Sequence, residues 1–171
     1  MISEKMLQAL NRQINNELYS AYLYYSMAAY FEDQNLFGFA NWFKVQTKEE
    51  LFHADKIYQY VNDRNGRVIL EAIAAPPTTW NSLLTAFEDA LKHEMEVTKM
   101  INELVDLSLA ERDYPTNHFL QWFLGEQIEE EASASQLVEK MKLVGDDRSG
   151  LFLLDQELGS RIFSTGADSA S

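Results

Sequence analysis

Apolar residues recur every three or four positions along four long segments of the chain, a spacing that places them on one face of an α-helix. The first segment begins near Ser3, a residue suited to cap a helix, and runs to about Gln34. Further helices are predicted over roughly residues 39–64, 82–112 and 116–144, followed by a short, strongly apolar helix over about residues 147–160. The pattern therefore predicts an all-α protein.

The connections between these segments predict how the helices are arranged. Short breaks at residues 35–38 and 113–115 indicate two antiparallel helical hairpins. Residues 66–80 contain an extended stretch and two consecutive prolines, so they are not helical. A helix of about 28 residues is roughly 42 Å long, and about 15 extended residues reach roughly 50 Å. The middle connection can therefore run the length of the molecule, giving a four-helix bundle with one long crossover and a short fifth helix.

Polar residues interrupt the apolar stripe of each of the four long helices near its middle. Because the middles of antiparallel helices meet, we expect these side chains to lie in one layer of the core. Carboxylates are rarely buried without compensation. The residues are Glu17 on the first helix, Glu50 and His53 on the second, Glu94 on the third, and Gln127 and Glu130 on the fourth.

This set of side chains has the composition of a metal site. Several carboxylates with one imidazole suit iron, manganese or zinc. Glu50 and His53 are three residues apart and share a helix face, so both can bind one ion. Glu50 is placed to bridge two ions, which would offset the buried negative charge and could bind O₂ between them. A buried polar network without metal would leave several carboxylates unneutralised, which is energetically unfavourable.

Two further features of the sequence each have two interpretations. Glu49, Glu126 and Glu129 flank the predicted centre and can either hold a third, weaker ion or form solvated helix faces. Tyr24 lies two turns from Glu17 on the same stripe. Its phenol can hydrogen-bond a metal ligand or donate an electron, or its ring can simply fill the core.

Composition narrows the classes of function. The net charge of −13 argues against nucleic acid and anionic membrane surfaces and would attract cations. The chain has no cysteine, which excludes disulfides, thiolate metal sites and thiol catalysis. No apolar run approaches 18 residues, and the first residues lack the apolar core of a signal peptide. We expect a cytoplasmic protein with one domain over residues 1–163 and a disordered tail over residues 164–171.

Taken together, these motifs resemble those of a ferritin, specifically the non-haem type of bacteria and archaea. The resemblance covers roughly residues 3–160 and rests on Glu17 within residues 16–20, on residues 49–54, on Glu94, and on residues 119–122 leading into 126–131. It implies a hollow cage of 24 subunits that oxidises Fe(II) with O₂ or H₂O₂ and stores the Fe(III) mineral inside. It also implies that the fifth helix packs at the four-fold axes of the cage.

The same resemblance implies a role for each site residue. Glu17, Glu50 and His53 would bind the first iron, and Glu50, Glu94 and Glu130 the second. A third site would comprise Glu49, Glu126, Glu129 and Glu130. Gln127 would lie beside the pair and bond water or dioxygen, and Tyr24 matches a tyrosine held near the centre.

The chain departs from the haem-containing branch of the family. Bacterioferritin has a second Glu-x-x-His motif on its fourth helix and a methionine that binds haem. Here the corresponding residues are Gln127 to Glu130, and Leu51 stands where the methionine would be. We therefore expect non-haem iron and no haem. The second iron lacks an imidazole and a further carboxylate, so we expect it to be held more weakly than the first, as suits iron in transit.

Two other functions would need a different set of residues. A small-oligomer di-iron or di-manganese oxidoreductase of the rubrerythrin kind would need Cys-x-x-Cys segments, and an oxygenase would usually carry the second Glu-x-x-His motif. A structural bundle without activity would lack the carboxylates that are present here.

Overall fold

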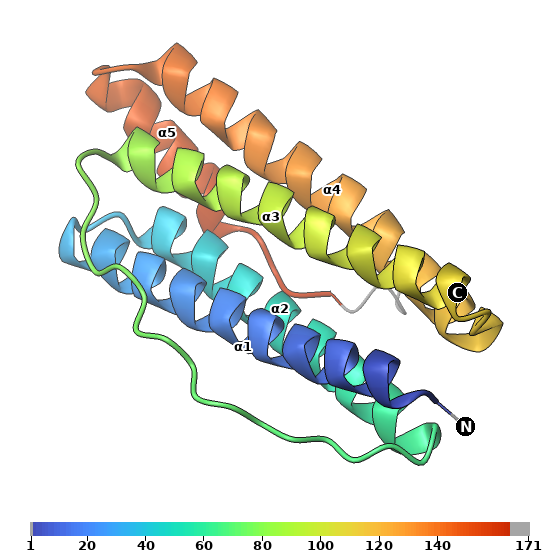
Figure 1. The fold of residues 1–171 in the computed structure, drawn as a ribbon. Helices are drawn as coiled ribbons and strands as arrows, with labels where there is room; N and C mark the ends of the chain where they lie inside the picture. Colours follow the sequence, from blue (N-terminus) through green and yellow to red (C-terminus); the bar gives the residue numbers. More distant parts are fainter. Residues whose placement is uncertain (1, 165–171) are drawn as a thin grey trace.

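The computed structural model of the protein describes residues 2–164, which form five helices (Figure 1). They are α1 (Glu4–Asp33), α2 (Phe37–Asp63), α3 (Leu83–Ala110), α4 (Tyr114–Val144) and α5 (Arg148–Gly159). The predicted four-helix bundle with one long crossover and a short fifth helix is confirmed. None of the described helices is both long and apolar enough to cross a membrane. Residues 165–171, most of the predicted disordered tail, lie outside the described residues.

Side-chain caps determine where most of these helices begin. The oxygens of Ser3, Ser82, Asp113 and Asp147 each accept a hydrogen bond from a backbone N–H in the first turn of the helix that follows. Such caps satisfy donors that have no partner within the helix. Because capping residues are visible in the sequence, the predicted helix starts lie close to the observed ones.

The crossover between α2 and α3 lies along α1 and makes α2 and α3 parallel (Figure 1). Asn11 fixes its first part by donating to the carbonyl of Arg67 at 3.1 Å and accepting from the N–H of Ile69 at 2.9 Å. Near its other end, Ser26 donates to the carbonyl of Pro77 at 2.5 Å. These bonds replace the secondary structure that this segment lacks.

Two apolar clusters fill the bundle, one towards each end. One contains the stacked rings of Phe31, Phe39 and Phe43. The other contains Leu10 and Ile101, among further apolar residues. The buried polar residues predicted for the site lie along the chain between members of the two clusters: Glu17, Glu50, His53, Glu94, Gln127 and Glu130. The hydrophobic effect thus stabilises both ends of the bundle around a polar middle layer.

The start of α2 differs from the prediction. We expected a break through Gly38, but the helix begins at Phe37 and includes Gly38. No local side chain caps it; instead, the carboxylate of Asp155 on α5 accepts from the N–H groups of Gly38 at 2.8 Å and Phe39 at 3.1 Å. A Cβ atom at position 38 would lie 1.6 Å from the carbonyl oxygen of Asp155. Glycine therefore permits the close approach of α5 rather than ending a helix.

Candidate metal centre

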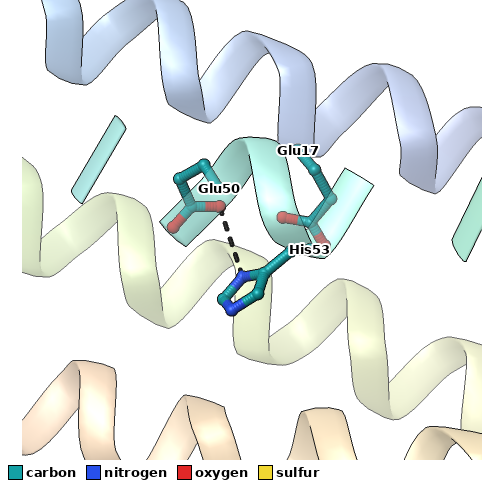
Figure 2. Close-up of side chains that lie close together, drawn as sticks. All are labelled: Glu17, Glu50 and His53. Carbon is teal, nitrogen blue, oxygen red and sulfur yellow. Dashed lines mark ion pairs between the residues drawn. The ribbon is translucent and has the colours of Figure 1, made fainter. Parts of the chain in front are cut away.

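Glu17, Glu50 and His53 form a compact group inside the bundle. One potential ligand atom from each lies within 4.8 Å of the other two, and this is the only such group of three or more acidic, His or Cys residues found among residues 2–164. Glu17 comes from α1, while Glu50 and His53 come from neighbouring turns of α2 (Figure 2). Each of the three residues is at most 2% exposed. Both helices contribute to the group because α1 and α2 pack as an antiparallel hairpin.

The carboxylates of this group retain unused ligand atoms. Gln13 donates to one oxygen of Glu17 at 2.8 Å, while the other oxygen of Glu17 is buried and accepts no hydrogen bond. One oxygen of Glu50 is likewise buried without a hydrogen bond and lies 3.7 Å from Nδ1 of His53. Buried acceptors without partners are costly. These two oxygens and the imidazole can all be satisfied by one divalent cation.

Burial strongly perturbs the titration of these residues. Burial raises the pKa of Glu50 well above its usual range, although His53 opposes the shift. Burial lowers the pKa of His53, but the carboxylates of Glu126 and Glu50 outweigh it, so the net shift is upward. A bound cation would lower the pKa values of both Glu50 and His53, because it favours ionised carboxylates and a neutral imidazole.

Glu94 on α3 lies within a set of hydrogen bonds. The phenol of Tyr24 donates to one of its oxygens, and Nε2 of Gln127 lies 3.2 Å from the other. Burial, and then the charge of Glu130, raise the pKa of Glu94 to about 8. Tyr24 thus bonds a predicted metal ligand, and Gln127 bonds the same carboxylate.

Glu130 on α4 is bonded to α2 through Gln46, whose Nε2 donates to it at 2.8 Å. Burial also raises the pKa of Glu130. The structure therefore links all four long helices in one polar layer. However, Glu94 and Glu130 are not within the 4.8 Å group that joins Glu17, Glu50 and His53. Both carboxylates are engaged by glutamine side chains instead.

The predicted third cluster lines a pocket of about 340 Å³ beside the centre. Glu49, Glu126, Glu129 and Glu130 all contribute to its wall, together with His53. Burial raises the pKa of Glu49 to about 7, although Arg161 opposes the shift. Nε2 of His53 lies 3.9 Å from Glu126, so this pocket and the centre share the imidazole.

Sequence reasoning did not identify three residues that contact the centre or its pocket. Gln13 lies one helical turn before Glu17, which accepts its hydrogen bond, and that spacing could have identified it. Gln46 lies one turn before Glu50 on the same apolar stripe, but its hydrogen bond is to Glu130 on α4. Arg161 ion-pairs with Glu49 at 2.8 Å. It follows the last helix, outside any periodic pattern, so no local signal indicated its position.

Comparison with known proteins gives a consistent relationship over nearly the whole chain. Residues 7–144 match the family described as "Ferritin-like domain". The chain is 44% identical over 163 residues to a protein of Staphylococcus saprophyticus named bacterial non-heme ferritin, and 43% identical to one of Staphylococcus aureus with the same name. Each match covers 95% of this chain and 98% of the relative.

Solved structures agree with the sequence matches. A structure of Archaeoglobus fulgidus ferritin engineered into a closed form superposes with a TM-score of 0.95 at 54% identity, covering 96% of this chain and 100% of that one. An open-pore ferritin from the same archaeon gives a TM-score of 0.94 at 54% identity, covering 95% and 100%. On its sequence, its fold and its buried carboxylate layer, the chain belongs to the ferritin family.

Proposed function

We propose that this protein stores iron by oxidising Fe(II) at the buried centre and depositing Fe(III) as mineral. The observation that carries this proposal is the group of Glu17, Glu50 and His53, with two buried carboxylate oxygens that have no hydrogen-bond partner. A core that keeps unsatisfied carboxylates is unfavourable unless a cation binds there. Membership of the ferritin family makes iron the expected cation.

The residues have distinct roles in this proposal. The first Fe(II) binds Glu17, Glu50 and His53, and the second binds Glu50, Glu94 and Glu130. Glu94 and Glu130 contribute carboxylate oxygens to the second ion, while Gln127 and Gln46 hold these carboxylates in place. Gln127 and Tyr24 then orient Glu94 and the oxidant.

The reaction balances as a two-electron oxidation. Each of two Fe(II) ions gives up one electron, and O₂ takes both electrons and two protons to become H₂O₂. Peroxide can in turn accept two electrons from two further Fe(II) ions, with two protons, to give two molecules of water. The protein provides ligands and orientation, while the iron supplies the redox chemistry. The Fe(III) product then hydrolyses, releasing protons, and leaves the centre as oxide.

The third site and the assembly are further parts of the proposal. Glu49, Glu126, Glu129 and Glu130 bind a third ion in the pocket next to the centre. The subunits form a cage of 24 copies in the cytoplasm, with α5 at its four-fold axes. Phe152 and Leu153 on α5 are more than half exposed in the single chain, which supports their burial against other copies.

Aerobic loading with Fe(II) tests the activity. The triple variant Glu17→Ala, Glu50→Ala, His53→Ala should lose fast Fe(II) oxidation, whereas Glu103→Ala, which removes an exposed carboxylate of α3, should retain it. Size-exclusion chromatography of loaded wild-type protein should show far more iron than three ions per chain, eluting with a cage-sized particle. An unchanged oxidation rate in the triple variant would show that the centre is assigned wrongly. About two irons per chain on a small oligomer would instead indicate a di-iron oxidoreductase.

A further inference from the structure

Arg161 places a fixed positive charge in the acidic pocket beside the centre. Four carboxylates line this pocket, and Arg161 is the only arginine or lysine among its described lining residues. Nη2 of the guanidinium lies 2.8 Å from Oε2 of Glu49. The side chains of this pair are 25% and 18% exposed, so water screens them only in part.

The guanidinium has a second contact that does not involve Glu49. Its central carbon lies 4.8 Å from the centroid of the Trp42 ring, a distance suited to a cation–π contact. Nη1 is buried and makes no hydrogen bond. Arg161 would therefore keep one attractive contact, with Trp42, if Glu49 were withdrawn from it.

The backbone around Arg161 is held in place, so the position of the guanidinium is a feature of the fold. Nδ2 of Asn41 donates to the carbonyls of Leu158 at 3.1 Å and Arg161 at 2.9 Å. Two residues later, the ring of Phe163 packs edge-on against Phe52 on the wall of the same pocket, with centroids 6.4 Å apart. These contacts join the segment after α5 to α2.

We propose that Arg161 is a positioning residue that acts as a displaceable counter-cation of the third metal site. It binds Glu49 when the pocket holds no metal and releases this carboxylate when a third cation arrives. The inference rests on the third site of the proposed function. Because the guanidinium and the metal ion carry like charges and compete for one carboxylate, Arg161 weakens the binding of the third ion.

This competition has a consequence for iron transport. An ion that must share the pocket with a guanidinium is held weakly and leaves readily. Arg161 therefore favours passage of iron through the pocket over permanent occupancy. Removing the charge of Arg161 should increase the affinity of the third site for cations.

Calorimetric titration of iron-free, assembled protein with Zn²⁺, which does not change oxidation state, tests this inference. Wild type should bind three ions per chain, the third most weakly. In Arg161→Gln, the Kd of the third step should fall about tenfold, while the first two steps stay within about twofold. Arg161→Lys keeps the positive charge and should restore the Kd of the third step to near the wild-type value.

The possible failures are distinguishable. Glu129→Gln should weaken the third step in both the wild-type and the Arg161→Gln background; if it leaves that step unchanged, the third site itself is assigned wrongly. If Glu129→Gln weakens the step but Arg161→Gln leaves its Kd unchanged or raises it, the third site stands and the role of Arg161 is refuted. Equal changes in all three steps for Arg161→Gln would mean general damage to the fold and would also overturn the inference.

Discussion

Replacing Glu94 by glutamine should make the metal-free protein more stable at alkaline pH, although it removes a proposed iron ligand. Glu94 is buried, and its pKa is raised to about 8 from an ordinary value of 4.5. A carboxyl with a raised pKa binds its proton more tightly in the folded state than in the unfolded state. Its contribution to stability is therefore fully present below about pH 4.5 and is lost as the pH rises towards 8. Glutamine has no proton to lose and removes this penalty.

The magnitude follows from the width of the pH window. Within it, each pH unit lowers the free energy of unfolding by about 1.4 kcal/mol. Allowing for partial ionisation near pH 8, Glu94 alone accounts for a loss of about 2 kcal/mol between pH 6 and 8. For a chain of this size, that corresponds to about 4 to 8 °C in the midpoint of heat unfolding. Glu50 and Glu130, whose pKa values are also raised, add to the loss in wild type.

The assay is heat unfolding in the presence of a chelator at pH 6 and pH 8, with one scan rate throughout because large assemblies unfold irreversibly. Glu94→Gln should reduce the fall in midpoint between the two pH values. Glu103→Gln removes an exposed carboxylate from the same helix and should behave as wild type. The reasoning is refuted if the midpoint falls equally in wild type and Glu94→Gln, or if Glu94→Gln is the less stable protein at pH 8.

Three further predictions concern individual contacts between helices. Gly38→Ala should displace α5 from α2, because the new Cβ would lie 1.6 Å from the carbonyl oxygen of Asp155. Limited proteolysis should then cleave the chain between α4 and α5, and a cleavage pattern like that of wild type would contradict this close approach. Arg64→Leu should lower the free energy of unfolding by about 1 to 3 kcal/mol, because the part-buried carboxylate of Asp113 loses the guanidinium that lies 3.1 Å from it. A loss below about 0.5 kcal/mol, which is typical of a solvent-exposed ion pair, would contradict a structural role for this pair. Tyr24→Phe removes the hydrogen bond from the Tyr24 phenol to Glu94 and should slow Fe(II) oxidation about tenfold, while Zn²⁺ binding is retained. An unchanged oxidation rate would show that Tyr24 only fills the core.

The sequence predicted the long elements well because their signals are local. Capping residues such as Ser3 and Ser82 mark helix starts within a residue of the observed ones. Glu17 and Glu50 were predicted to lie in the core because a carboxylate in an apolar stripe conflicts with its surroundings, and both are buried. Such a conflict is visible without knowledge of the fold.

Contacts between distant segments could not be predicted in the same way. Asp155 caps α2 from more than 100 residues away, and Arg161 reaches Glu49 across a similar separation. Neither residue differs in its local pattern from an ordinary surface charge. Their roles arise only from the position of α5 against α2, which the helical period of α5 does not specify.

The ligands of the proposed di-iron centre are divided between the two hairpins, and this division bears on how safely the chain folds. Glu17, Glu50 and His53 all belong to α1 and α2, whereas Glu94 and Glu130 belong to α3 and α4. On the proposed assignment, a chain whose first hairpin has formed but whose second has not yet docked would offer ligands for only one Fe(II). One Fe(II) supplies one electron, which reduces O₂ to superoxide rather than to peroxide. On that assignment, docking of the hairpins would do more than complete the fold: it would turn a site that generates superoxide into one that transfers electrons in pairs.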